Sequence, residues 1–237
     1  MDQALAQNIF DISSVRLHDI GQVITLSNGN KFRYSLAGSS ALGAGKLGIA
    51  AAQAANHTNR TATATAVGAI SMSLALGATA AVKDEYADGW AMVNVTPGPG
   101  QNLRIAGHAA VSSSGTASLD LIDPVKVALT TSSKVTLVHN PNRLVVEGTT
   151  ATIPAAGVPG VAVTASYYYW AQTHGPAPVL NDQNLTSGTY LKASGSVAGA
   201  VADNADTTAP ITEFTVGIAA FGTGADTEYR PIYLTID

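Results

Sequence analysis

The sequence predicts a mainly β protein, an antiparallel β-sandwich or barrel-like architecture with little helix. Apolar and polar residues alternate along much of the chain, a period of two that is typical of half-buried strands. Gly, Pro, Asn and Ser residues interrupt these runs at short intervals, as expected of turns between strands. The Ala-rich segment 40–56 is the main competitor, and its glycines leave room for at most a short helix after Gly48.

The clearest predicted hairpin covers residues 22–37, QVITLSNGNKFRYSLA. At its centre, Asn28 and Gly29 supply the positive φ angles that a type I′ turn needs. Alternation in the second arm places Phe32 and Tyr34 on one face and the charged residues of that arm on the other. Further strands are predicted in segments 61–81, 89–111 (around a Pro-Gly turn), 123–140 (a hairpin around residues 131–133), 211–222 and 229–237.

Composition predicts two β regions. Residues 1–150 form an N-terminal and central β region that begins with an N-terminal arm, MDQALAQNIFDISS. Residues 151–237 form a C-terminal β region, because the segment 148–160 is rich in Gly, Pro and Thr and is typical of a boundary.

Charge is sparse and unevenly distributed. Charged residues make up 12% of the chain, which is about half the usual share. Small polar side chains therefore cover much of the surface, or a partner protein covers part of it. Residues 144–237 carry two Lys/Arg against eight Asp/Glu, a net charge of −6, and this excludes the basic clusters of a nucleic-acid-binding surface there.

Motifs of catalytic or cofactor chemistry are missing from the sequence. The phosphate-loop pattern around GAGK fails, because Ser40 and Leu47 stand where Gly and Ser/Thr are needed. The five histidines show no metal-binding spacing, and Asp120 and Asp123 would point to opposite faces of a strand. We therefore predict no catalytic residue, no cofactor, no metal site and no enzymatic activity. The chain also lacks a membrane-spanning stretch and a secretion signal, which predicts a protein that stays in the cytoplasm or is assembled there.

Four consecutive aromatic residues, Tyr167 to Trp170, stand out in a chain with only 6% aromatics. On a strand, Tyr167 and Tyr169 share one face, and Tyr168 and Trp170 share the other. A ligand platform would gather its aromatics on one exposed face. Two aromatic faces instead favour a strand packed on its own core and on a second sheet or a neighbouring subunit. The strand is expected to end, or to lie at a sheet edge, at its two prolines, Pro176 and Pro178.

Several phrases of the sequence together resemble a known family. They are LSNGNKFRYSLAGSSALGAGKL, EYADGWAMVNVTPGPGQNLRIAGH, LDLIDPVKVALTTSSKVTLVHNPN, YYYWAQTHGPAPVL and TEFTVGIAAFGTGADTEYRPIYLTID, which span most of the chain from about residue 22 onward. In this order they resemble the head decoration, or cement, proteins of tailed bacteriophages.

The resemblance implies a non-enzymatic virion protein, commonly a homotrimer, on the outer surface of the capsid. Such a protein is assembled in the host cytoplasm, bridges subunits of the major capsid protein, and uses neither nucleic acid nor a membrane. The resemblance assigns no interface residues. From this sequence itself we expect an interface at Tyr167, Tyr168, Tyr169 and Trp170 of the aromatic run and at Ile9 and Phe10 of the N-terminal segment. That segment is either an arm that reaches a neighbour or an ordinary frayed terminus.

Three alternatives stay open from the sequence. The chain could be another virion component, such as a tail or fibre-base protein. It could be a carbohydrate-binding module that uses the aromatic run, or a β-fold glycosidase in which two carboxylates face each other across a cleft.

Overall fold

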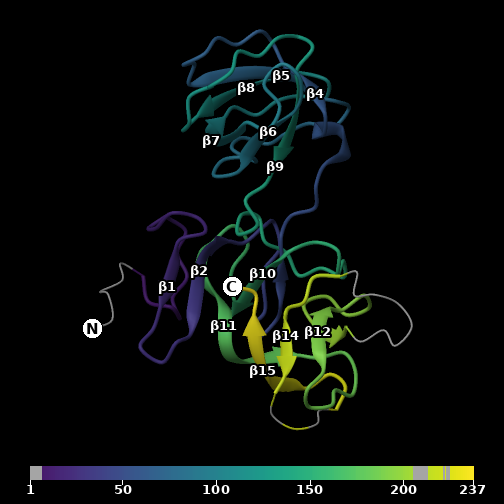
Figure 1. Cartoon of the computed structure of the whole chain (residues 1–237). Coiled ribbons are helices and arrows are strands. Elements are labelled where there is room, and N and C mark those ends of the chain that lie inside the picture. The colour runs from purple at the N-terminus through teal and green to yellow at the C-terminus, as the bar shows by residue number, and fades with distance from the viewer. Residues whose placement is uncertain (1–6, 205–212, 221, 223–224) are drawn as a thin grey trace. The chain divides into compact units, whose positions relative to one another are not determined.

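Strands joined by turns make up the part of the chain that the computed structural model describes, residues 7–204, 213–220, 222 and 225–237 (Figure 1). Within these residues the helical structure is a single 3-10 turn, Ala55–His57. All ladders between the named strands are antiparallel. This confirms the predicted mainly β, antiparallel fold class.

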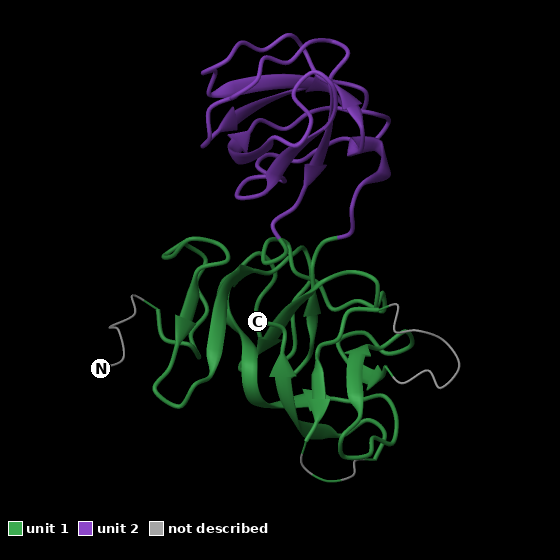
Figure 2. Ribbon diagram, in the orientation of Figure 1, with its two compact units in different colours: residues 1–51, 141–237 green, residues 52–140 purple. Residues whose placement is uncertain are grey.

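The chain forms two compact units (Figure 2). Unit 2 is Ala52–Asn140, and unit 1 consists of the segments on either side of it, Met1–Ala51 and Pro141–Asp237. These bounds differ from the predicted division at residue 150. The segment after residue 141 belongs to unit 1 because Val145 and Val146 form bridges to Ala37 and Ile49 of the first segment. Such long-range pairing leaves no local trace in composition.

Unit 2 is a six-stranded sheet that nearly closes into a barrel. Its strand order is β4-β9-β6-β7-β8-β5, and a bridge between Ala62 and Leu74 brings its two edges together. Inward residues alternate along the strands and fill the interior with aliphatic side chains. The strands are β4 (Arg60–Thr61), β5 (Ser71–Ala75), β6 (Trp90–Val95), β7 (Asn102–His108), β8 (Thr116–Leu121) and β9 (Lys134–Val138).

Unit 1 is built on a sheet of order β1-β2-β11-β15-β14-β12-β13, with β10 and β3 joined to it through β11. Its longest strand, β11 (Tyr168–Leu180), lies between β2 and β15. Buried side chains form three neighbouring hydrophobic clusters in this unit. The other strands are β1 (Val23–Thr25), β2 (Lys31–Leu36), β3 (Gly48–Ile49), β10 (Ala155–Pro159), β12 (Tyr190–Ala193), β13 (Val201–Asp203), β14 (Gly217–Ala219) and β15 (Tyr229–Thr235).

The hairpin predicted over residues 22–37 is present as β1 and β2, and Phe32 and Tyr34 are buried on one face. Its turn is not of type I′. Gly29 has a φ of +86°, but Asn28 is not among the residues with positive φ. The Asn28 side chain instead accepts a hydrogen bond from the Asn30 N–H, which stabilises a longer loop.

The hairpin predicted over residues 123–140 is only half correct. Its second arm is β9, but residues 123–128 form no strand. The side chain of Gln101 binds this segment, since its oxygen accepts from the N–H groups of Lys126 and Val127 and its nitrogen donates to the Val127 carbonyl. These bonds satisfy backbone groups that a strand would have placed in a ladder.

Pro176 and Pro178 do not end β11. The strand continues to Leu180 and pairs with β15, where Pro176 lies opposite Tyr233 and Pro178 lies opposite Pro231. Pairing of β11 with β2 stops at His174. The missing N–H groups of Pro176 and Pro178 therefore break no hydrogen bond to β2. Of the two outcomes predicted for the prolines, a strand end is wrong, and a position at the sheet edge is confirmed, because this part of β11 has lost β2 as a neighbour and keeps β15.

The N-terminal segment packs on unit 1 from Gln7 onward, whereas residues 1–6 of the predicted arm lie outside the described residues. Gln7 is buried; it accepts a hydrogen bond from the Tyr34 hydroxyl at 2.8 Å and donates one to the Tyr168 carbonyl at 3.1 Å. The indole N–H of Trp170 donates to the Gln7 carbonyl at 3.1 Å. This part of the segment is a cover for the aromatic cluster and not an extended arm.

An ion pair between Arg33 and Asp237 gives unit 1 a testable dependence on pH. The Arg33 guanidinium donates to both carboxylate oxygens at 2.6–2.9 Å. Burial opposes ionisation of Asp237, but the hydrogen bonds from Arg33 and Thr173 outweigh it and lower the pKa of Asp237. Because the folded pKa lies below the unfolded value of about 3.9, the pair stabilises above that value, and its contribution is lost as pH falls through the folded pKa.

We expect Asp237→Asn to lower the free energy of unfolding of unit 1 by about 1 kcal/mol at neutral pH. The difference from the native protein should vanish in strong acid, where the native carboxylate is protonated. Urea unfolding of both proteins at neutral and strongly acid pH measures this. A difference that persists unchanged in acid would contradict the assignment of the effect to the ion pair.

Candidate functional site

The aromatic run is part of the core of unit 1. Tyr169 and Trp170 are almost completely buried, and Tyr167 and Tyr168 are partly buried against the same clusters. The ring of Trp170 meets that of Tyr34 edge-on at a centroid distance of 5.0 Å. Burial raises the pKa of the Tyr169 hydroxyl above its ordinary value. Both faces of the strand are therefore covered by unit 1 itself, and of the two covers that the sequence left open for the second face, the neighbouring subunit is not needed.

This placement corrects the predicted interface. Tyr169 and Trp170 are inaccessible to a partner, and no glycan can stack on a buried indole. The carbohydrate-binding alternative therefore loses the platform on which it depended. Of the two interface residues predicted in the N-terminal segment, Ile9 is half-buried and packs against the cluster of Trp170, whereas Phe10 is 61% exposed.

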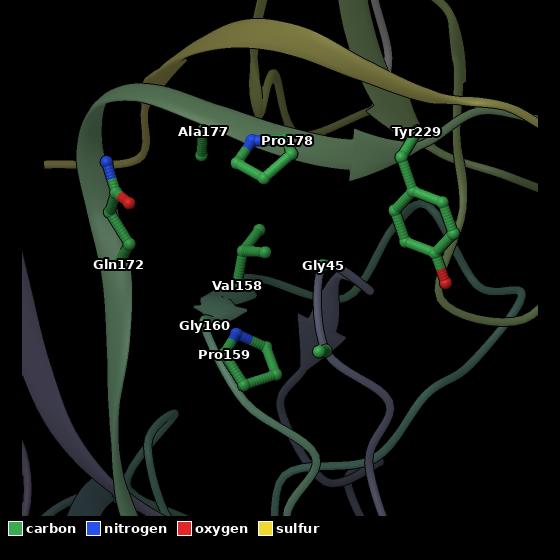
Figure 3. A pocket seen from close by; sticks show the side chains of 9 residues that line it. Gly45, Val158, Pro159, Gly160, Gln172, Ala177, Pro178 and Tyr229 are labelled. Atoms are coloured by element: carbon green, nitrogen blue, oxygen red, sulfur yellow. The ribbon is translucent and has the colours of Figure 1, made fainter. Parts of the chain in front are cut away.

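Phe10 lies next to a pocket of unit 1. Its ring contacts Gly160, where an added Cβ would come within 3.2 Å of Cε1 of Phe10. The pocket beside it has a volume of about 280 Å³ and lies in a bend of β11, between the limb that carries Gln172 and the limb that carries Ala177 and Pro178 (Figure 3). Its lining residues are Ala44, Gly45, Val158, Pro159, Gly160, Gln172, Ala177, Pro178 and Tyr229. The pocket is mostly apolar.

A second candidate surface lies at one end of the barrel of unit 2. The loop 66–70 runs beside the segment 121–125, because Gly68 N–H donates to the Val125 carbonyl and Leu121 N–H donates to the Ile70 carbonyl. Four aliphatic side chains on or just after these segments are 48–66% exposed, namely Val67, Ile70, Ile122 and Val127. We call them the apolar end of unit 2. Strands β6 and β8 run toward this end and β5, β7 and β9 start there, so it is opposite the end where the chain enters and leaves the unit.

Three of the five histidines gather inside unit 2, although the sequence scatters them. His57, His108 and His139 surround the ring of Tyr86, which is completely buried. The Nδ1 atom of His57 accepts from the Tyr86 hydroxyl and its Nε2 donates to the Thr79 carbonyl. Because the cluster is enclosed, it can order the core but cannot meet a substrate.

The carboxylates of Glu85 and Asp123 in unit 2 are engaged in structural contacts. Glu85 accepts hydrogen bonds from His139 at 3.3 Å and from the Val82 N–H at 3.0 Å. Burial opposes ionisation of Glu85, yet these bonds lower its pKa below the ordinary value. Asp123 pairs with Arg104 at the surface. In the part of the chain that the structure describes, no three His, Asp or Glu side chains come together as a metal-binding group.

Comparisons with known proteins add no family. No protein-family model matches the chain, and neither a curated protein nor a solved structure shows detectable similarity to it. Within the described residues, none of the helical structure is long and apolar enough to cross a membrane. The pocket and the apolar end of unit 2 could not be found from the sequence, because each is assembled from segments that are far apart in it.

Proposed function

We propose that this chain is a non-enzymatic structural protein of a bacteriophage particle, a decoration protein that binds the outer capsid surface and bridges subunits of the major capsid protein. The proposal includes a homotrimer, as the resemblance of the sequence implies. It also includes assembly in the host cytoplasm onto the shell, without a nucleic acid or a membrane as partner.

The apolar end of unit 2 is the observation that carries this proposal. Exposed aliphatic side chains usually occur singly, whereas adjacent ones on neighbouring loops are typical of a protein-binding surface. The charged side chains beside this surface are Lys126 and the paired Arg104 and Asp123, which do not form a basic cluster, and the chain as a whole is poor in Lys and Arg. A symmetric shell presents many equivalent sites, so a contact of this modest size gains strength from multiple attachment.

A protein that binds only the mature shell stabilises that shell by mass action. Co-sedimentation of the purified protein with mature and immature heads tests the proposal, with the bound copies counted per head. Saturable binding in multiples of three with a preference for mature heads is the expected result. Absence of binding to either kind of head would overturn the decoration proposal and leave a tail or fibre-base component as the next candidate.

A matched pair of variants tests the surface itself. Val67 in the apolar end is 62% exposed, and Val82, near the opposite end of the unit, is 64% exposed. We expect Val67→Lys to reduce binding to heads at least about tenfold, since a contact of apolar surfaces must then bury a charge. Val82→Lys should bind like the native protein. Equal losses for both variants, or for neither, would remove the apolar end from the proposed interface.

A further inference from the structure

The pocket of unit 1 has walls that are fixed by the backbone. Gly45 N–H donates to the Pro159 carbonyl at 2.8 Å, and Leu180 N–H donates to the Gly45 carbonyl at 3.0 Å. These bonds tie the loop before β3 to β10 on one side and to β11 on the other. The pocket is therefore already formed before any ligand arrives, as is usual for binding sites.

Gln172 contributes the one amide side chain of the lining, and its orientation is settled by hydrogen bonds. Its Nε2 donates to the carbonyls of His174 and Pro176, both at 3.0 Å. Since only the nitrogen can donate, these two bonds fix which end of the amide is which. The oxygen lies on the side that faces the pocket (Figure 3), and among the described residues none donates a hydrogen bond to it. The pocket thus offers one oriented acceptor within apolar walls.

The mouth of the pocket is aromatic. The ring of Tyr229 lies over Gly45, where an added Cβ would be 2.8 Å from the ring, so the absence of a side chain at position 45 makes room for it. Beyond the opposite rim, Phe10 packs on Gly160. The exposed ring of Phe10 therefore extends the apolar lining by one side chain beyond this rim of the pocket.

Size, polarity and charge define the occupant. A cavity of about 150 Å³ holds a benzene ring, so a pocket of about 280 Å³ has space for a fused ring system. Because the Gln172 oxygen is a hydrogen-bond acceptor, it favours a ring that carries an N–H donor. No Asp, Glu, Lys or Arg is among the described residues that line the pocket, so nothing there would pair with the charged groups of a free amino acid.

We propose that this pocket binds the indole ring of a tryptophan side chain that a partner protein presents, with the indole N–H donating to Gln172 Oε1. The ring packs between the pocket walls formed by Val158, Pro159 and Pro178, and Tyr229 closes over it. Buried tryptophans that fill a pocket and satisfy one hydrogen bond are typical anchors of protein interfaces. The inference goes beyond the decoration proposal and does not depend on it.

N-acetyl-tryptophanamide is the probe, titrated into the full chain labelled with ¹⁵N. We expect saturable shifts of the amides of Gly45, Gly160, Gln172 and Tyr229, with a dissociation constant on the order of 1 mM for a ligand of this size. The 1-methyl derivative has the same ring without the N–H and should bind about fivefold more weakly. Absence of saturable shifts at these amides, or equal affinity for the methylated probe, would overturn the proposal.

Free tryptophan is the second ligand to be titrated. It carries the same ring with a charged ammonium and carboxylate, and it should bind no more tightly than the capped probe. Tighter binding of the free amino acid would point to a small-molecule site and overturn the assignment to a partner's side chain. Because this experiment uses no phage heads, its failure and the failure of the decoration proposal are distinguishable.

A matched pair of variants tests whether the probe binds in this pocket. Tyr229 and Tyr190 belong to the same unit and are 51% and 53% exposed. Tyr229→Ala should abolish the shifts, and Tyr190→Ala should leave them unchanged. Ala44→Leu, a change on the exposed rim that narrows the mouth, provides a second test if Tyr229→Ala fails to fold. Retention of native affinity by Tyr229→Ala or by Ala44→Leu would exclude the pocket as the binding site.

Discussion

Replacing Trp170 with alanine is expected to lower the free energy of unfolding of unit 1 by about 3–5 kcal/mol, the range found when large aromatic side chains are removed from a core. Trp170 is 1% exposed, contacts the rings of Tyr34 and His18, and donates its indole N–H to the Gln7 carbonyl. The substitution leaves a cavity and also removes one of the hydrogen bonds that hold the N-terminal segment over the aromatic cluster. A domain retains only about 5–15 kcal/mol in total, so this one change brings unit 1 close to unfolding.

Denaturant unfolding followed by native-state hydrogen exchange measures this effect separately in the two units. Faster exchange should appear in β2 and β11 and at Leu17, whose N–H donates to the Tyr34 hydroxyl. Trp170→Phe keeps much of the ring and should lose less stability. A loss below about 1 kcal/mol for Trp170→Ala, the size typical of an exposed residue, would contradict the burial of the indole.

The fold class could be predicted because strand periodicity and turn residues are local signals. The alternation in KFRYSL is enough to assign the faces of Phe32 and Tyr34, and the structure confirms both. Periodicity fails where a distant side chain intervenes. Val125 and Val127 alternate as well as many strand residues do, but the side chain of Gln101 takes the backbone groups of that segment.

The aromatic run shows what strand alternation can and cannot predict at a candidate site. Alternation correctly separated Tyr169 from Trp170 onto two faces, since the two residues lie in different clusters. The sequence could not tell that both faces are covered within one chain. That cover comes in part from the segment around Gln7, more than a hundred and fifty residues away along the chain. Tyr169 and Trp170 therefore drop out of the predicted interface, whereas Phe10 stays exposed.

The two candidate surfaces share this dependence on distant segments. The pocket combines the loop at Gly45 with β10, both limbs of β11 and the first residue of β15. A glycine at position 45 and a glutamine at position 172 carry no signature by themselves. Only the bend of β11 brings the Gln172 amide to face an apolar wall, and sequence patterns of period two do not encode such a bend.

Replacing Tyr86 with alanine is expected to cost unit 2 about 3–5 kcal/mol. Tyr86 is completely buried and stacks on the ring of His139 at a centroid distance of 4.4 Å. Its hydroxyl donates to Nδ1 of His57, a residue that is itself fully buried. The substitution therefore creates a cavity and leaves the His57 acceptor without its partner, and these two costs add in the same direction.

Tyr86→Phe separates the two contributions, because it keeps the ring and removes only the hydroxyl. We expect it to cost about 1–3 kcal/mol, the range for an orphaned buried acceptor. In the double variant with His57→Leu the acceptor is absent as well, so the loss on removing the hydroxyl should shrink. Unfolding free energies of the four proteins form a complete double-mutant cycle. Strictly additive losses would mean that the hydroxyl and the imidazole stabilise the barrel independently, and the cluster would then be a matter of packing alone.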